Sequence, residues 1–239
     1  MLFPHTRRRR AERHSVISSK DNPKLKLVRG LQRKKEREET GLFACEGEDL
    51  CDAALEAGIE PVELLIAGET VESDLLAAVS TLPHPPRAIG VFRRSDLPVG
   101  TRESCLALWR LSDPGNVGTL IRSADAFGAA VSLSEGCADP LSQKALRASA
   151  GAIFRVPLVA WDDRPGRLIG LDASGAATLA DVDLEPPVTI VLGAERAGLP
   201  DDLLAACDAV ASIPMPGDAE SLNVAAAGAI ALYELARRG

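Results

Sequence analysis

Three turns rich in Gly, Pro and Asn, each directly after an apolar strand-like run, constrain the fold of this chain most strongly. They occupy residues 113–118, 193–200 and 213–217 in the C-terminal half. Short apolar runs alternate there with helical patterns, which predicts a doubly wound, mainly parallel sheet with helices on both faces. Each turn would end a buried strand, and open α/β sheets bind ligands at the carboxyl ends of their strands.

The charge of the chain is divided unevenly along its 239 residues. Residues 1–37 hold 13 of the 27 Lys and Arg residues against three acids, although the whole chain has a net charge of −7. This asymmetry predicts an N-terminal end that faces nucleic acid. A solvated basic tail without function is the alternative. Residues 1–15, which include four consecutive arginines, are predicted to be disordered.

The sequence argues against several classes of protein. Its five cysteines form no Cys-x-x-Cys pair and its three histidines lie far from them, so no metal site is expected. The odd, scattered cysteines are typical of a reduced cytosolic protein. No apolar run approaches the roughly 20 residues that span a bilayer, and no secretory signal is recognisable. We therefore expect a cytoplasmic protein without membrane association.

Two α/β domains joined by a linker are predicted. The first covers residues 16–94, and its elements are a basic helix beginning near Pro23, strands at 41–47, 61–67 and 88–93, and helices at 49–57 and 73–80. Residues 95–104 form the linker. The second covers residues 105–239, with strands at 105–111, 129–133, 153–159, 167–171, 188–192 and 209–213, and helices at 117–127, 142–148 and 222–238.

The first turn combines a strong turn signal with a helix start. The free N–H groups at the beginning of the following helix suit an anion or a carboxylate. The fork of Arg122 suits a phosphate or a carboxylate, and we expect Arg122 and Asn116 to reach the same strand end. The alternative is an ordinary loop with a surface arginine and a capping asparagine.

The other two turns carry further polar groups. Gly193 and Gly198 flank Glu195, and glycine permits a ligand to approach the backbone closely. In the third turn, prolines stiffen the backbone around Met215, and Ser221 precedes a helix with small residues on all faces. Such a helix must pack closely against a ligand loop or another subunit, although Ser221 is equally a plain helix cap. The nicotinamide and ATP fingerprints are absent.

Together, these segments resemble the SpoU/TrmH family of S-adenosylmethionine-dependent RNA ribose 2′-O-methyltransferases, within the SPOUT superfamily. The matching segments are 113–118 with Arg122 and 126–128 (motif 1), 192–199 (motif 2), 213–215 with 221–224 (motif 3), and 144–152. Phe43, Glu46 and Gly47 are similar to positions in the family's ribosomal-protein-like RNA-binding domain. The resemblance covers nearly the whole chain from about Val16.

The resemblance implies a C-terminal domain with a deep trefoil knot, a homodimer with sites completed across the interface, and no metal. The implied catalytic residues are Arg122, Asn116, Glu195, Ser221 and Asn223. The implied cofactor-binding residues are Leu192, Gly193, Gly198, Ile213, Met215, Leu222 and Ala225. The N-terminal domain and the segment around residue 147 predict RNA-binding residues, namely Lys20, Lys24, Lys26, Arg29, Arg33 and Arg147.

The expected reaction is methylation of a ribose 2′-hydroxyl in ribosomal RNA or, as a second choice, transfer RNA. The family assigns the role of base to the position of Arg122. Because a free arginine has a pKa above about 12, binding a phosphate and stabilising the alkoxide is the physically safer role. Ala194 and Ala225 replace the Asn and Ser that are frequent in the family. These departures keep open a non-catalytic RNA-binding or ribosome-associated protein; a knotted base methyltransferase is disfavoured.

Overall fold

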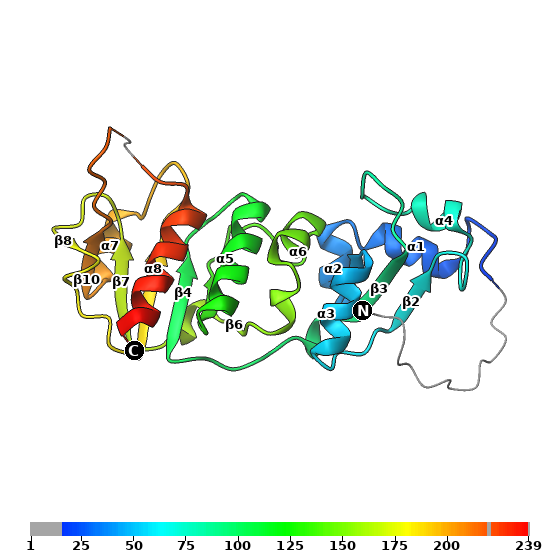
Figure 1. The fold of residues 1–239 in the computed structure, drawn as a ribbon, viewed down its shortest axis with the longest axis horizontal. Coiled ribbons are helices and arrows are strands. Elements are labelled where there is room, and N and C mark those ends of the chain that lie inside the picture. Colours follow the sequence, from blue (N-terminus) through cyan, green and yellow to red (C-terminus); the bar gives the residue numbers. More distant parts are fainter. Residues whose placement is uncertain (1–15, 219–220, 239) are drawn as a thin grey trace.

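The computed structural model describes residues 16–218 and 221–238, and the predicted tail at residues 1–15 lies outside these ranges. Within them, two sheets lie in the two halves of an elongated molecule (Figure 1). The N-terminal half contains α1 (Pro23–Gly30), α2 (Lys34–Thr40), β1 (Leu42–Glu46), α3 (Glu48–Glu56), β2 (Glu63–Ile66), α4 (Ser73–Ala77) and β3 (Ala88–Arg93). Its strands pair antiparallel in the order β1-β3-β2.

The C-terminal half is built on a parallel sheet with the strand order β6-β5-β4-β9-β7-β10-β8. Its elements are β4 (Ser104–Leu108), α5 (Pro114–Ala126), β5 (Ala130–Leu133), α6 (Gln143–Ser149), β6 (Leu158–Val159), β7 (Arg167–Leu171), β8 (Ala177–Thr178), β9 (Val188–Leu192), α7 (Asp201–Ala206), β10 (Ala209–Ser212) and α8 (Val224–Arg238). This confirms the predicted doubly wound α/β fold. From β4 the chain runs outward through β5 and β6, then crosses to β7 on the other side, and β9 later inserts between β4 and β7. The strand order therefore reverses at the β4–β9 pair.

The first predicted turn forms the start of α5. The Asp113 carboxylate accepts hydrogen bonds from the N–H groups of Gly115 (2.6 Å) and Asn116 (3.1 Å), and Pro114 follows at the first helical position. Farther along, Gly118 lets α5 approach α6, because a Cβ there would lie 2.3 Å from the Ala145 carbonyl oxygen. The turn sequence therefore determines both where α5 begins and how closely it packs.

The two halves share a hydrophobic core. One cluster of buried side chains includes Phe43 and Phe92 from the N-terminal sheet together with Leu106 and Phe154 from the C-terminal half. The rings of Phe43 and Phe92 lie 6.3 and 5.7 Å from that of Phe154, centroid to centroid. Because this apolar surface is continuous, the N-terminal half is packed onto the C-terminal half and is not merely tethered by the linker.

A buried ion pair crosses the same boundary. The guanidinium of Arg37, on α2, donates to one carboxylate oxygen of Asp139 at 2.9 and 2.6 Å and to the carbonyl of Leu31 at 2.7 Å. Arg37 is 6% exposed, so its charge is almost fully removed from water. Nearby, the Gln143 amide donates to the Ala44 carbonyl at 2.7 Å. These bonds set the orientation of the two halves as well as their contact.

One predicted strand is wrong. Residues 153–159 form a 3₁₀ turn, η2 (Ala152–Phe154), and only Leu158 and Val159 pair as β6. Ile153 and Phe154 turn inward to fill the core between the halves, where both are at most 2% exposed. A short apolar run has the same composition in either conformation, so only the tertiary packing distinguishes them. Within the described residues, no helix has the length and apolar character needed to cross a bilayer.

We predict that Asp139→Ala lowers the free energy of unfolding by about 3 kcal/mol, because it leaves the Arg37 guanidinium buried without its partner. The control is Glu38→Ala on α2, the helix that carries Arg37. Glu38 pairs with Lys34 at 3.6 Å in an exposed ion pair, so its loss should cost less than about 1 kcal/mol. Urea unfolding of the two variants measures the difference. Equal midpoints would contradict the role assigned to the buried pair.

Candidate cofactor and substrate site

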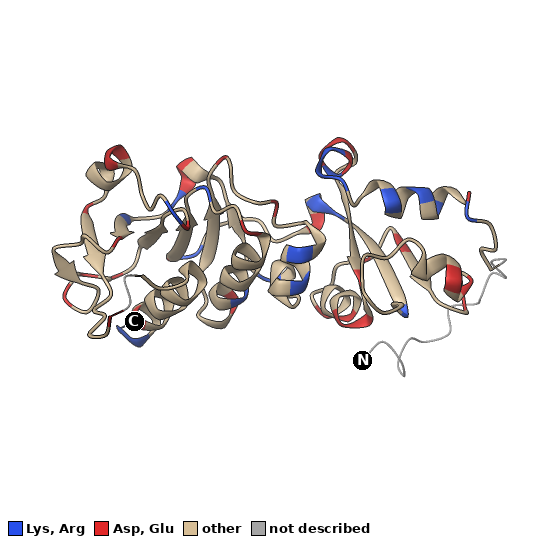
Figure 2. Ribbon diagram, turned by 90° about the horizontal axis from the view of Figure 1, so that it is seen from above, with Lys and Arg blue, Asp and Glu red and all other residues tan. Residues whose placement is uncertain are grey.

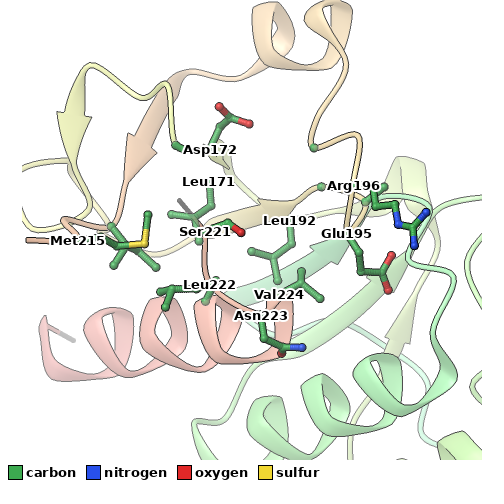
Figure 3. Close-up of a pocket in the computed structure, with 16 residues that line it drawn as sticks. Leu171, Asp172, Leu192, Glu195, Arg196, Met215, Ser221, Leu222, Asn223 and Val224 are labelled. Atoms are coloured by element: carbon green, nitrogen blue, oxygen red, sulfur yellow. The ribbon is translucent and has the colours of Figure 1, made fainter. Parts of the chain in front are cut away.

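A cavity of about 600 Å³ lies at the carboxyl ends of β7, β9 and β10 and against the start of α8. Leu171, Met215 and Leu222 lie on one side of it, and Glu195 and Arg196 lie on the other (Figure 3). The size is that of a small-molecule site. The cavity also lies beside the reversal of strand order, where doubly wound sheets hold ligands.

Most of the predicted cofactor-binding residues line this cavity. They are Leu192, Gly193, Gly198, Ile213, Met215 and Leu222. Ala225 is the exception, because it faces the hydrophobic core and is 7% exposed. Its neighbours Val224 and Ala227 line the cavity instead. Helix α8 thus contributes to the site, but through Val224 and Ala227 and not through the expected Ala225.

The second turn closes on itself through its backbone. The N–H of Ala194 donates to the Gly198 carbonyl at 3.1 Å, and the N–H of Gly198 donates back at 2.9 Å. A Cβ at Gly193 would lie 2.2 Å from the Gly198 carbonyl carbon, and Gly198 has a φ of +63°. Both glycines are therefore required by the loop itself. The side chain of Ala194 takes no part in this closure.

Glu195 joins the second turn to the first. Its carboxylate accepts hydrogen bonds from the backbone N–H groups of Ser112 (3.3 Å) and Asp113 (3.2 Å) and from the side-chain amide of Asn116 (3.3 Å). Partial burial by itself would raise the pKa of Glu195, but these donors and its own backbone N–H hold the pKa below the ordinary value. Glu195 is therefore ionised at neutral pH, and it holds the first turn, which precedes α5, against the second turn.

Asn116 and Asn223 join the first turn to the third. The amide of Asn223 donates to the side-chain oxygen of Asn116 at 3.4 Å. The side-chain oxygen of Asn223 also caps α8 by accepting from the N–H groups of Ala225 (2.8 Å) and Ala226 (3.3 Å). One chain of hydrogen bonds therefore runs from Glu195 through Asn116 to the start of α8. It connects motifs 1, 2 and 3, the three segments identified in the sequence.

Asp113 is tied to α6 as well as to its own helix. Its second carboxylate oxygen lies 2.7 Å from the ammonium of Lys144. That hydrogen bond, together with the N–H donors of the cap, lowers the pKa of Asp113. Lys144 thus neutralises the carboxylate that begins α5.

Arg122 does not join this network within one chain. It is exposed on α5, does not line the cavity, and makes no hydrogen bond or ion pair with any other described residue. Arg122 follows Asn116 by six helical residues, which places the two residues about 9 Å apart along the helix axis and about 120° apart around it. The expectation that both reach the same strand end is wrong for a single chain. Ser221, in contrast, is exposed at the cavity rim.

The predicted RNA-binding residues occupy α1, its flanks and α6. Lys and Arg gather on α1, α2 carries Lys and Arg interleaved with Glu, and acidic residues mark α7 at the far end of the molecule (Figure 2). Several of the cations have partners: Lys24 pairs with Glu63 (2.7 Å) and Lys26 with Asp21 (3.3 Å). The remaining contacts are Arg33 with Glu36, Arg29 with the carbonyl of Lys20, and Arg147 with the hydroxyl of Thr81 across the domain boundary.

Sequence reasoning missed two charged residues that line the cavity, Asp172 and Arg196. One carboxylate oxygen of Asp172 accepts from the N–H (2.9 Å) and hydroxyl (2.6 Å) of Ser174. The residue directly follows β7, so the rule that identified the three turns, a polar residue at the end of a strand, would have found it. Arg196 lies inside the second turn, and no catalytic, cofactor-binding or RNA-binding role was predicted for it.

The donor set of the cavity fits S-adenosylmethionine. Apolar side chains at one end suit a purine, free backbone groups suit its edges, and carboxylates at Asp172 and Glu195 suit hydroxyl and ammonium donors. No group of three or more His, Cys, Asp and Glu side chains that could hold a metal ion occurs in the described part of the chain.

The fold and the cavity define a doubly wound α/β protein with a small-molecule site at its topological switch point, coupled to a second domain that carries a basic helix, α1. The SpoU rRNA Methylase family matches residues 103–233, and the MRM3-like substrate binding domain matches residues 22–89. The chain is 33% identical to the 23S rRNA (guanosine(2553)-2′-O)-methyltransferase RlmP of Bacillus subtilis, over 92% of this chain and 98% of RlmP.

Two solved structures are similar over nearly their whole length. One is an AdoMet-bound rRNA methyltransferase from Sinorhizobium meliloti (TM-score 0.81, 31% identity, 93% of this chain and 97% of that one). The other is the SpoU methyltransferase AviRb from Streptomyces viridochromogenes in complex with AdoMet (TM-score 0.80, 28% identity, 91% and 98%).

The chain belongs to the SpoU rRNA methylase family. The identification made from its three turns is therefore confirmed. So is the predicted class of enzyme, an RNA 2′-O-ribose methyltransferase with S-adenosylmethionine as its cofactor.

The lowered pKa of Glu195 predicts how cofactor binding depends on pH. A carboxylate whose pKa is depressed by folding keeps its stabilising bonds above its ordinary pKa, about 4.3, and loses them as the pH falls through the depressed value. We expect S-adenosylmethionine affinity, measured by calorimetry, to stay constant from neutral pH down to about pH 5 and to fall below about pH 4.

The variant Glu195→Gln tests the same network. It should weaken cofactor binding about tenfold at neutral pH, the scale of one hydrogen bond to a charged group, and should remove the loss at low pH. Glu135→Gln, an exposed carboxylate outside the cavity, serves as the control and should behave as the wild type. A Glu195→Gln variant that keeps wild-type affinity throughout would show that this carboxylate does not organise the site.

Proposed function

We propose that this chain methylates a ribose 2′-hydroxyl of 23S ribosomal RNA. The observation that carries the proposal is the hydrogen-bonded chain from Glu195 through Asn116 to Asn223, which holds three turns around one cavity. Nearly the whole chain is similar to RlmP, a 23S rRNA (guanosine(2553)-2′-O)-methyltransferase, which supports ribosomal over transfer RNA. The match of residues 22–89 to a substrate-binding domain supports a structured RNA gripped at a distance from the methylated ribose.

In this proposal the bound cofactor supplies an electrophilic methyl group, and the chain supplies position and charge. Leu171, Met215 and Leu222 hold the apolar part of the cofactor, and Asp172 and Glu195 accept its polar donors. Ser221 and Asn223, at the cavity rim, orient the target nucleotide. Holding the hydroxyl in line with the methyl group is the main contribution, since well-oriented reactions gain roughly 7–11 kcal/mol.

Arg122 acts in this scheme from the second subunit of a homodimer. Its side chain lies outside the cavity of its own chain, so a partner's cavity is where it meets a reacting ribose. A dimer face is available on α8, where Ile230 is 41% and Tyr233 is 56% exposed. Tyr233 also packs edge-on against Phe127 at the end of α5, 6.2 Å between centroids. The guanidinium there binds a phosphate and stabilises the developing alkoxide.

The remaining features of the proposal follow the family. The C-terminal domain, residues 105–239, contains a deep trefoil knot formed by the loops after β9 and β10. Residues 16–94 form the RNA-binding domain and 95–104 the linker, with Lys20, Lys24, Lys26, Arg29, Arg33 and Arg147 facing RNA. The enzyme works in the cytoplasm, where unmodified ribosomal RNA is found.

The two departures from the family pattern do not favour a non-catalytic protein. At Ala194 the loop is closed by backbone bonds, which any side chain permits. At Ala225 the contribution to α8 is its N–H, which donates to Asn223, and its methyl group fills the core. Neither alanine removes a bond on which the geometry of the cavity depends, so a working site is retained.

We predict that Arg122→Ala lowers the rate of methyl transfer about 10²–10³-fold, as the loss of a charge-stabilising donor does in other enzymes. S-adenosylmethionine affinity should be unchanged, because Arg122 does not line the cavity. Single-turnover kinetics and calorimetry measure the two quantities. Arg167→Ala, at the opposite edge of the sheet, is the matched control. Equal loss of binding and transfer would rule out the role assigned to Arg122.

Mixing inactive variants tests the shared site. Arg122→Ala and Asn223→Ala subunits, unfolded together and refolded, form hybrid dimers in which one site has both residues intact. We expect about a quarter of the wild-type activity to return, because half of the dimers are hybrids and one of their two sites works. Recovery of none would place Arg122 in the site of its own chain.

Methyl transfer itself is tested with labelled S-adenosylmethionine and unmodified 23S ribosomal RNA made by transcription, followed by nuclease digestion and nucleoside analysis. A 2′-O-methylated nucleoside is the expected product. Label on a base would overturn the ribose assignment. Absence of label on this RNA, with label on transfer RNA, would replace the proposed substrate.

A further inference from the structure

Arg110, two residues beyond β4, has a backbone conformation that side-chain-bearing residues rarely adopt. Its φ is +50°, and among residues 16–218 and 221–238 Ala150 is the only other non-glycine residue with a positive φ. Glycine would occupy this conformation without the steric cost. An arginine kept in a strained position at the ligand-binding edge of the sheet therefore points to a use for its side chain.

The surroundings of Arg110 hold that side chain in place. Its N–H donates to the hydroxyl of Ser134 at 2.9 Å, which ties the end of β4 to the end of β5. A Cβ at Gly136 would lie 3.2 Å from Nε of Arg110, so the absence of a side chain there leaves room for the arginine to cross the loop. Arg110 is exposed, and its guanidinium has no hydrogen-bond or ion-pair partner among the described residues.

Arg196 is a second cation of this kind. It is exposed at the rim of the cofactor cavity, and no described residue pairs with it. The strands β9, β4 and β5 are neighbours in that order and run parallel. Arg196 follows β9, Arg110 follows β4, and α6 with Lys144 and Arg147 follows β5. The topology thus orders Arg196, Arg110 and the two α6 cations as a row that leads from the cavity toward the N-terminal domain, with α6 between α5 and that domain (Figure 1).

No carboxylate of the described residues pairs with Arg110 or Arg196, and this includes Glu135 after β5 and Asp172 after β7. Glu195 accepts from backbone N–H groups and Asn116, and Asp113 caps α5 and pairs with Lys144. Asp139 is committed to Arg37. The guanidinium groups of Arg110 and Arg196 are therefore free for a ligand of opposite charge.

We propose that Arg110 and Arg196 bind backbone phosphates of the RNA strand that runs from the target ribose to the N-terminal domain. This inference rests on the proposed function, because it describes the path that the methylated RNA takes over the protein. The guanidinium fork matches phosphate geometry. The two residues follow adjacent strands, β4 and β9, which lie about 4.8 Å apart, so one RNA strand that crosses this edge of the sheet passes both.

The shared core and the Arg37–Asp139 pair give this row a fixed length. The basic helix α1 and its neighbour α2 cannot move relative to the cavity without exposing that core. The RNA must therefore present its N-terminal-domain contacts and its target ribose at one set distance, which makes the row a determinant of specificity as well as affinity.

The test compares Arg110→Gly, Arg196→Ala and the control Arg167→Ala, which removes the same charge at the opposite edge of the sheet. Arg110→Gly relieves the backbone strain, so its melting temperature should equal or exceed that of the wild type. Binding to a transcript of unmodified 23S ribosomal RNA is measured by filter retention over a range of KCl concentrations, and S-adenosylmethionine affinity is measured separately.

We expect each of Arg110→Gly and Arg196→Ala to weaken RNA binding about fivefold at moderate salt and to lower the slope of log K against log salt by about 0.7–0.9, the value for one lost phosphate contact. S-adenosylmethionine affinity should match the wild type in Arg110→Gly, whose side chain lies outside the cavity, and the Arg167→Ala variant should match the wild type in RNA binding. Unchanged slopes in both variants, or an equal loss in Arg167→Ala, would overturn the proposed path.

The outcomes separate this inference from the proposed function. If the wild type methylates the RNA but the variants have unchanged salt slopes, the proposed RNA path is wrong and the proposed function stands. If the wild type binds the RNA but does not methylate it, the proposed function is wrong. Lowered salt slopes in the two variants would still show that Arg110 and Arg196 contact phosphates of the bound RNA. Absence of RNA binding by the wild type overturns both.

Discussion

The carboxylate of Glu195 is the interaction on which the site depends. The strands β4 and β9 are neighbours, but the loops that follow them have no backbone pairing to hold them together. Glu195 replaces that pairing by accepting two backbone N–H groups of the first turn and the amide of Asn116. Through Asn223 the same bonds reach the start of α8. The cavity therefore has its shape before any ligand arrives, which is the condition for efficient positioning.

The packing between the halves is the second constraint. An N-terminal domain on a flexible linker would add affinity for RNA without specifying where the ribose falls. Here the aromatic rings of Phe43, Phe92 and Phe154 and the buried Arg37–Asp139 pair hold the domain in one orientation. The cost of burying that pair is offset only while its geometry is kept. The basic helix α1 and the cavity thus behave as parts of one surface.

Much of the fold was predictable because the sequence is locally consistent. Alternating apolar runs and helix signals predicted the parallel sheet, and Asp113 with Pro114 predicted the start of α5. Two of the failures share one physical cause. The conformation of residues 153–159 and the core-facing position of Ala225 depend on what lies across from them in space. Periodicity and composition carry no information about those neighbours.

By itself, the sequence determined the doubly wound fold, the three turns and the family, because turn residues such as Gly193 and Gly198 are dictated by local backbone geometry. Only the tertiary structure decided which groups meet. It joined Glu195, Asn116 and Asn223 into one network, and it placed Arg122 outside the cavity of its own chain. It also aligned Arg110 and Arg196 along one edge, since the order of strands in a sheet is set by long-range packing and not by their order in the chain.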